Sequence, residues 1–247
     1  MWKAHPIAIS VSAVGGIFQV HDGRERIAVA VEARAHQFFK HGIAVRRELL
    51  TGRYLRGIVP INPGAAVINF GANIGEIAIT LADRGAIVTA IEPDPNVIPA
   101  LEANAIGRLV EVVPVAAWRE DGELDMHIAS DTADTSIFEP KAGRSTGRMT
   151  LPCRRIDTIV SERGLTRVHL LVGDAEGAEP EVLMGARETL QITDYVSLSG
   201  SDERCGQTTV DACEKILKDA GFDILHREDT KFCMLIAKRR EISLALA

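Results

Sequence analysis

The chain has 247 residues, of which 46% are hydrophobic and 25% charged, and its formal net charge is −6. This length and composition are typical of a globular protein that can bury a sizeable core. The acidic balance argues against non-specific binding to nucleic acid or to an acidic membrane surface, so we expect neither as a partner. The four cysteines include no C-x-x-C pair, which predicts reduced thiols in a cytoplasmic protein, with neither a zinc site nor a disulfide framework.

The N-terminal part predicts a small β-element followed by a helix. Apolar residues alternate with small or polar ones near the start, and a second apolar run spans 27–31. The Asp22-Gly23 dipeptide before that run favours a hairpin turn, and a helical stretch follows over 34–56. We therefore predict a cap over 1–57 ahead of a main domain over 58–247. The β-element of the cap could mediate a homodimer.

The main domain alternates strands with helices. Strands are predicted at 65–70, 86–91, 110–117, 123–128, 169–173, 194–199, 222–227 and 231–237, and helices at 74–83, 95–106, 154–163, 180–190 and 208–220. Residues 129–148 are polar and contain glycine, which predicts a loop. The alternation predicts an α/β fold with a mostly parallel sheet, helices on both faces and a C-terminal antiparallel hairpin.

The first strand of this domain ends in Gly71-Ala72-Asn73-Ile74-Gly75, and a helical pattern follows at once. Glycines let the backbone approach a ligand, and a helix N-terminus can hold a carboxylate. The turn lacks the spacing of a dinucleotide fingerprint, and Glu76 would repel a pyrophosphate. These features favour S-adenosylmethionine, which carries a sulfonium and an ammonium but no phosphate, over a nicotinamide dinucleotide.

Two further strand ends carry residues that suit a nucleoside. Glu92 lies twenty-one residues after Gly71, where a carboxylate can accept both ribose hydroxyls. The small residues Ala116 and Ala117 leave space for a flat ring such as adenine, although ordinary packing is the better explanation when these residues are taken alone. The cofactor site is therefore predicted where these strands end.

A fourth strand end carries three carboxylates, Asp174, Glu176 and Glu179. They are our candidate catalytic residues, with Asp174 the first choice of base for deprotonating an acceptor hydroxyl. Helix capping is the alternative role, above all for Glu179. A divalent metal held by the three carboxylates is a further alternative. His169 and His226 are weaker candidates for the base.

Taken in order, these motifs resemble the FkbM-type S-adenosylmethionine-dependent methyltransferases. The resemblance is carried by Val67 to Gly75, Ile91-Glu92-Pro93, Leu101 with Asn104, Ala116-Ala117, Asp174 to Glu179, and Leu183 with Gly185-Ala186. It implies a Rossmann-like, seven-stranded class I methyltransferase sheet. It also implies O-methylation of a hydroxyl on a small molecule, a sugar or another natural product.

The resemblance also assigns residues to the cofactor. The methionine end would meet the glycine turn, Glu92 would hold the ribose, the two alanines would border the adenine, and Asp174 with Glu176 would face the transferred methyl group. The predicted cofactor-binding residues are Phe70, Gly71, Ala72, Asn73, Gly75, Glu92, Pro93, Asp94, Ala116, Ala117 and Asp174.

This chain departs from the usual family pattern at four positions. Asn69 stands where Asp is usual, Val172 where Lys is usual, Gly173 where a bulky aliphatic residue is usual, and Ser199 where an acidic residue is frequent. These departures motivate an alternative function, a non-catalytic S-adenosylmethionine-binding or scaffold protein. A nicotinamide-dependent dehydrogenase is a third hypothesis.

Overall fold

A computed structural model describes residues 8–129, 135–138, 145–200, 204, 206–230 and 233–241. The strands are β1 (Ser10–Val14), β2 (Ile17–His21), β3 (Arg26–Val29), β4 (Ala66–Phe70), β5 (Ile87–Ile91), β6 (Val110–Val113), β7 (Ala116–Ala117), β8 (Gly122–Ala129), β9 (Ser145–Arg154), β10 (Val168–Gly173), β11 (Thr193–Ser199), β12 (Phe222–Arg227) and β13 (Met234–Arg239). The helices are a 3₁₀ helix η1 (Glu32–Phe38), α1 (Ile43–Leu55), α2 (Glu76–Asp83), α3 (Ile98–Ala105), α4 (Ile156–Glu162), α5 (Glu179–Met184), α6 (Arg187–Leu190) and α7 (Val210–Asp219).

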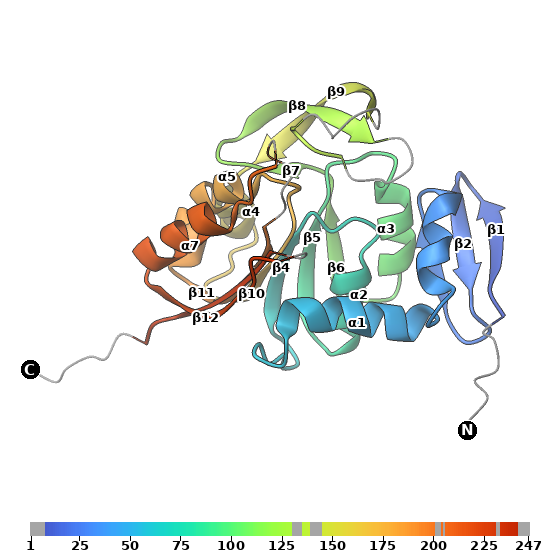
Figure 1. Cartoon of the computed structure of the whole chain (residues 1–247), viewed down its shortest axis with the longest axis horizontal. Coiled ribbons are helices and arrows are strands. Elements are labelled where there is room, and N and C mark those ends of the chain that lie inside the picture. Colours follow the sequence, from blue (N-terminus) through green and yellow to red (C-terminus); the bar gives the residue numbers. More distant parts are fainter. Residues whose placement is uncertain are drawn as a thin grey trace, which may run out of the picture.

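The central feature is a seven-stranded sheet in the order β12-β13-β11-β10-β4-β5-β6 (Figure 1). The pairs from β11 to β6 are parallel, whereas β13 is antiparallel to both β11 and β12. The predicted mostly parallel sheet and its antiparallel hairpin are therefore confirmed. The parallel strands bring the carboxyl ends of β4, β5 and β10 to one edge of the sheet, where such folds bind ligands.

Side chains that alternate along β4 build the core on both faces of this sheet. Ile68 and Phe70 pack with residues of α4, α5 and α7, while Val67 packs with residues of α1 and α2. Helix α7 shows the matching helical pattern, because Val210, Cys213 and Leu217 are its buried residues. The strand and helix periods of the sequence thus place helices on both faces, as predicted.

Two predicted strand and loop regions differ from the structure. The predicted strand 110–117 is divided at Pro114 into β6 and β7, which belong to different sheets, because proline has no N–H for a continuous ladder. The predicted loop 129–148 is wrong from Ser145, where β9 begins, and much of the rest lies outside the described residues. Strand β9 pairs with β8, a partner that its own pattern did not indicate.

Two predicted helices are also interrupted. The stretch 34–56 is the 3₁₀ helix η1 followed by α1, and Gly42 between them has a φ of 77°. The stretch 180–190 is divided into α5 and α6 at Gly185. A Cβ at Gly185 would lie 2.1 Å from the backbone oxygen of Trp118, so the interruption brings this helix pair close to the second sheet.

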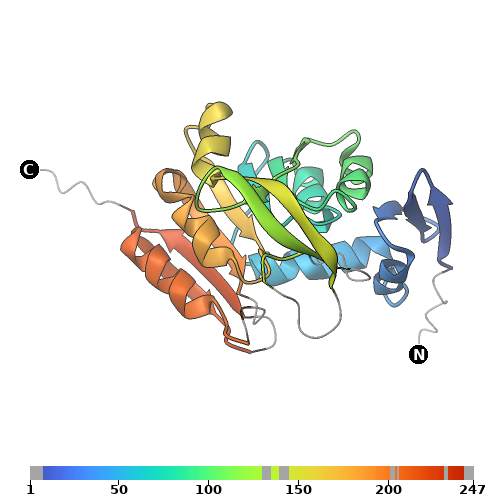
Figure 2. The same ribbon diagram turned by 90° about the horizontal axis from the view of Figure 1, so that it is seen from above.

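Strands β7, β9 and β8 form a separate three-stranded sheet. The β8–β9 ribbon crosses above the carboxyl edge of the large sheet in both views (Figures 1 and 2). Trp118, Met126 and Leu151 are part of its buried cluster. The second sheet therefore covers part of the carboxyl edge of the large sheet.

The N-terminal residues form a third sheet, β1-β2-β3. The Asp22-Gly23 turn joins β2 to β3 as predicted, and the Gly15-Gly16 turn joins β1 to β2. Ile27, Val29 and Phe38 of this cap pack with core residues of α2 and α3. The cap therefore lies against the helices that follow the glycine turn.

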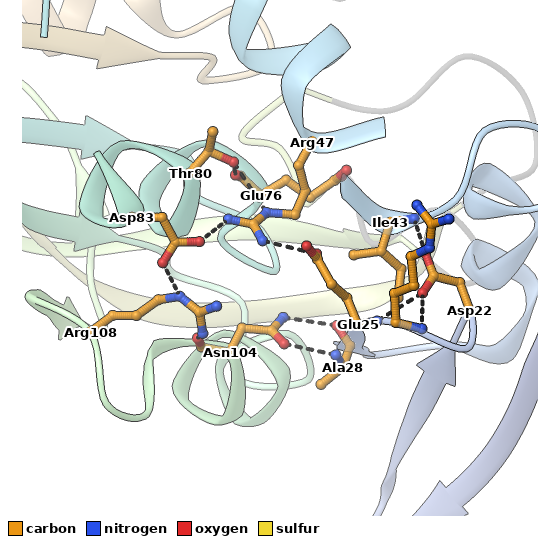
Figure 3. A network of polar contacts seen from close by, with 11 residues as sticks. Asp22, Glu25, Ala28, Ile43, Arg47, Glu76, Thr80, Asp83, Asn104 and Arg108 are labelled. Carbon is orange, nitrogen blue, oxygen red and sulfur yellow. Dashed lines mark hydrogen bonds and ion pairs between the residues drawn. The ribbon is translucent and has the colours of Figure 1, made fainter. Parts of the chain in front are cut away.

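Asn104 of α3 connects the cap to the glycine turn, and Figure 3 shows its contact with Ala28 of the cap. Its Oδ1 accepts a hydrogen bond from the Ala28 N–H (2.7 Å), and its Nδ2 donates to the Ala28 carbonyl (2.9 Å). The same Nδ2 donates to the carbonyl of Ile74 (2.8 Å). This buried amide thus pairs with the cap strand as another strand would, while it also holds the turn.

Replacing Asn104 with leucine should lower the free energy of unfolding by about 2–4 kcal/mol, because buried backbone groups at Ala28 and Ile74 lose their partners. Denaturant unfolding measures the loss. Glu102→Leu on the exposed face of the same helix is the matched control and should change stability by less than about 0.5 kcal/mol. Equal stabilities of the two variants would contradict the role given to Asn104.

Candidate functional site

A cavity lies at the carboxyl edge of the large sheet, between the cap and the β7–β9–β8 sheet. Of the predicted cofactor residues, those that line it are Phe70, Gly71, Ala72, Asn73, Glu92, Pro93, Ala116, Ala117 and Asp174. Glu176, one of the catalytic candidates, lines it as well. The four predicted strand ends singled out in the sequence therefore meet at one cavity.

The first glycine of the turn, Gly71, is needed because the backbone of Asp174 packs directly against it. Gly71 has a φ of 58°, and a Cβ at this position would lie 1.7 Å from the backbone oxygen of Asp174. Gly75 also has a positive φ, of 87°, at the start of α2. Gly71 thus lets the turn pack directly against the segment that carries the catalytic candidates.

Glu92 ties the glycine turn to the end of β5. Its Oε2 accepts a hydrogen bond from the Asn73 N–H (2.7 Å), and its Oε1 accepts one from the Asp94 N–H (3.0 Å). This buried side chain lines the cavity, and a carboxylate can only accept hydrogen bonds. The geometry suits a group that binds hydroxyls.

Gly75 and Asp94 are not among the residues that line the cavity. Asp94 accepts hydrogen bonds from the Asn96 N–H (2.8 Å) and from the Thr135 hydroxyl (2.5 Å). Its side chain therefore supports the loop after β5. Thr135 itself lines the cavity, so Asp94 shapes the site through that residue.

Asp174 and Glu176 face the same cavity from the loop after β10. Asp174 Oδ1 accepts a hydrogen bond from the Glu176 N–H (3.0 Å), and Glu176 has a φ of 48°. Positive φ is uncommon for a residue with a side chain. The tight turn brings the two residues onto the same cavity wall.

Glu179, the third predicted catalytic residue, lies beneath this loop and not on the cavity wall. It is fully buried, and it accepts hydrogen bonds from the N–H groups of Ala175 (2.8 Å) and Gly177 (3.1 Å) and from the Thr209 hydroxyl (2.6 Å). Burial, and then the charge of Asp174, raise the pKa of Glu179 to about 7. The geometry supports the structural alternative for this residue, and no group of three metal-binding side chains occurs in the described part of the chain.

The raised pKa of Glu179 predicts a pH-dependent stability. The Glu179 carboxyl binds its proton more tightly in the folded protein than in the unfolded chain. The stability that this protonated carboxyl contributes is therefore complete below pH 4.5 and is lost as the pH rises through about 7. The free energy of unfolding should fall by on the order of 2–3 kcal/mol across this interval relative to Glu179→Gln. Glu188→Gln, at an exposed site, should keep the wild-type dependence, and parallel curves for all three proteins would contradict the prediction.

The cap contributes cavity residues that the sequence did not indicate. Arg46, Leu50 and Tyr54, spaced four residues apart, line the cavity along one face of α1. The cap also contributes Ala30, Arg34, Gln37 and Phe38. The four-residue spacing of Arg46, Leu50 and Tyr54 predicts that they share one face of α1, but only the tertiary structure shows that this face lines the cavity.

Tyr54 is held by the two serines of β11. The Ser197 hydroxyl donates to the Tyr54 carbonyl (2.7 Å), and the Ser199 side chain is hydrogen-bonded to the Tyr54 phenol. Burial, and then the charge of Asp174, raise the pKa of this phenol well above its usual range. Tyr54 is therefore a protonated hydroxyl near Asp174, and Ser199, a departure from the family pattern, is part of its support.

The second sheet also contributes cavity residues that the sequence did not indicate. Trp118, Leu124 and Met126 line the cavity next to Ala116 and Ala117. These apolar side chains suit a flat aromatic ring. The sequence placed the alanines at the end of one long strand, so it did not predict that a separate sheet surrounds them.

The departures at Asn69 and Val172 occupy directly paired positions of neighbouring strands. Asn69 pairs with Val172 between β4 and β10, and the Asn69 amide donates to the Val172 carbonyl (3.2 Å). A neutral pair thus stands where the usual pattern has an acidic and a basic residue. The glycine at position 173 has a different explanation, because a Cβ there would lie 2.1 Å from the Phe70 backbone oxygen.

The two histidines lie away from the cavity. His169 contacts Asp194 (3.1 Å) and the Pro60 carbonyl (2.6 Å) at the opposite edge of the sheet. His226, in β12, lies 3.9 Å from Glu228. Neither histidine is placed to act as the base.

Comparison with known proteins identifies the family. The family model of the methyltransferase FkbM domain matches residues 69–224. The chain belongs to the FkbM methyltransferase family. This FkbM-family membership confirms the predicted methyltransferase class, with S-adenosylmethionine as its cofactor.

Two relatives carry more specific names. The 2-O-methyltransferase NoeI of Sinorhizobium fredii is 26% identical over 201 residues, which cover 73% of this chain and 81% of NoeI. The 31-O-demethyl-FK506 methyltransferase FkbM of Streptomyces tacrolimicus is 30% identical over 175 residues, which cover 58% of this chain and 67% of that protein.

A solved structure matches at lower similarity. Magnesium protoporphyrin IX methyltransferase (ChlM) from Synechocystis, crystallised with bound SAM, is 16% identical to this FkbM-family chain, with a TM-score of 0.47 and 78% of each chain covered. Across the described residues, no helix of the chain is long and apolar enough to cross a membrane.

Proposed function

We propose that this protein is an O-methyltransferase that transfers a methyl group to a hydroxyl of a small molecule, a sugar or another natural product. The observation that carries the proposal is the cavity whose wall includes Glu92 together with Asp174 and Glu176. The names of NoeI and FkbM, which describe O-methylation of their own substrates, support the choice of oxygen.

The lining of the cavity fits a cationic cofactor. Four carboxylates and two guanidinium groups line it: Glu76, Glu92, Asp174, Glu176, Arg34 and Arg46. This excess of negative charge suits a ligand that carries a sulfonium and an ammonium. Glu76 is paired with Arg46 (3.0 Å), so its charge argues less strongly against an anionic ligand than the sequence suggested.

The residues of the cavity have distinct roles in this proposal. Bound S-adenosylmethionine supplies an electrophilic methyl group, whose transfer needs the acceptor oxygen in line behind it. Glu92 would hold the ribose, and Ala116 with Ala117 would border the adenine. Asp174 would accept the proton of the acceptor hydroxyl as the hydroxyl oxygen bonds to the methyl carbon and the bond from that carbon to the sulfonium sulfur breaks, which would leave S-adenosylhomocysteine as the second product. The cap and the second sheet would exclude water from the cavity.

Calorimetry with S-adenosylhomocysteine, combined with a turnover assay, tests the proposal. Replacing Glu92 with glutamine should weaken binding about 10- to 100-fold, because a charged acceptor for the ribose is lost. Glu111→Gln is the matched control. Glu111 lies on the next strand, β6, where it forms an exposed ion pair with Arg163, so the variant should bind like the wild type.

Turnover separates the methyltransferase from the non-catalytic alternative. The wild type should form S-adenosylhomocysteine and a methylated product with at least one member of a panel of hydroxylated acceptors. Cofactor binding without turnover across a broad panel would favour a binding or scaffold protein. Absence of cofactor binding would contradict both functions, and tight NADH binding would favour a dehydrogenase.

A further inference from the structure

Helix α1 presents an ordered row of three side chains to the cavity. Arg46, Leu50 and Tyr54 lie four residues apart on one helix face and all line the cavity. Tyr54 lies near Asp174, whose charge acts on its phenol. Arg46 lies at the end of the row opposite Tyr54.

The Arg46 guanidinium is fixed along one edge. Its Nε donates to Glu76 Oε1 (3.0 Å), and its Nη2 donates to Glu76 Oε2 (3.4 Å) and to Gln37 Oε1 (3.0 Å). Among the described residues, Nη1 makes no hydrogen bond to the protein. Since the side chain is 26% exposed and lines the cavity, the N–H groups of Nη1 are available to a ligand there.

Arg46 lies beside the glycine turn through its pairing with Glu76. Glu76 is the first residue of α2, directly after Gly75, and Glu92 contacts the same turn at Asn73. A ligand with its nucleoside at Glu92 would extend along the turn toward Arg46. The amino-acid part of the cofactor would then reach the guanidinium.

Charge decides which group of that amino-acid part Arg46 can hold. The carboxylates Glu76, Asp174 and Glu176 suit the ammonium and the sulfonium, but they would repel the carboxylate of the cofactor. A planar guanidinium held at one edge is well suited to a carboxylate at its other edge, because its fork of donors is already oriented.

We propose that Arg46, positioned by Glu76 and Gln37, binds the α-carboxylate of the methionine part of the cofactor. This inference rests on the proposed use of the cavity for S-adenosylmethionine. It assigns to the cap a part in cofactor binding, in addition to covering the acceptor.

Two ligands that differ only in the carboxylate provide the test. They are S-adenosylhomocysteine and its decarboxylated form, S-adenosyl-3-thiopropylamine, each titrated by calorimetry. The wild type should bind S-adenosylhomocysteine about 10- to 100-fold more tightly than the decarboxylated ligand. In Arg46→Met combined with Glu76→Gln, which leaves no unpaired charge at Glu76, the two ligands should bind within about threefold of each other.

Two single variants serve as controls. Glu76→Gln alone retains Arg46, the contact of Arg46 with Gln37 and a side-chain oxygen that can accept from the Arg46 Nε, so it should retain a preference for the carboxylate ligand. Arg34→Met removes the other guanidinium of the cavity and should also retain it. Far-ultraviolet circular dichroism and melting temperature establish that each variant is folded, and binding of the decarboxylated ligand establishes that its nucleoside site is intact.

The outcomes distinguish this inference from the proposed function. If the wild type binds neither ligand, the methyltransferase proposal itself fails. If the wild type binds both ligands equally, or if the double variant keeps the preference, only the role of Arg46 is overturned. Loss of the preference in Arg34→Met with its retention in the double variant would assign the carboxylate to Arg34 and would likewise overturn the inference.

Discussion

Replacing Asp174 with asparagine should lower kcat for a hydroxylated acceptor by roughly 10²- to 10⁴-fold, because the neutral amide cannot accept the acceptor proton. The affinity for S-adenosylhomocysteine should fall far less, since Glu92 and the glycine turn remain. The charge of Asp174 also raises the pKa of Tyr54. An ultraviolet titration of the two tyrosines of the chain should therefore show a lower pKa for Tyr54 in the variant.

Asp194→Asn is the matched control for this prediction. Asp194 pairs with Arg167 (2.9 Å) at the opposite edge of the same sheet, so its loss should leave kcat unchanged. Turnover by Asp174→Asn within about threefold of the wild type would exclude Asp174 as the base. Glu176, the other carboxylate of that loop on the cavity wall, would then become the first candidate.

Replacing Gly71 with alanine should have the largest effect on the fold of the site. The new Cβ would lie 1.7 Å from the backbone oxygen of Asp174, and the φ of 58° is unfavourable for alanine. We expect a loss of about 3–5 kcal/mol in the free energy of unfolding. Cofactor binding should fall as well, because the turn and the Asp174 loop must separate.

Gly15→Ala isolates the conformational part of this effect. Gly15 has nearly the same φ, 59°, but no atom lies within 4 Å of a Cβ at that position. Its replacement should therefore cost only about 1–2 kcal/mol. Equal losses for the two variants, measured by denaturant unfolding, would mean that the contact between the turn and Asp174 contributes nothing.

The α/β fold could be predicted because its signals are local. The apolar strand at Ile87–Ile91, for example, is buried over most of its length, which is the pattern of a central parallel strand. Pro114 divided one predicted strand, and the pairing of β9 with β8 created another. Strand β9 forms because it pairs with another segment of the chain, and the periodicity of its own residues does not predict that pairing.

The sequence by itself determined which strand ends form the site. Gly71, Glu92 and Asp174 each follow a strand of a parallel sheet, and such a sheet brings its carboxyl ends to one edge. The order of strands and helices was therefore enough to predict that these three residues lie close together.

Only the tertiary structure decided which side chains complete that site. It placed Glu179 beneath the loop as a buried acceptor, and it brought Arg46 and Tyr54 of the cap to the cavity wall. It also showed that Asn69 and Val172 are paired across two strands. These relations depend on packing between segments far apart in the chain, and residue spacing within one segment carries no information about that packing.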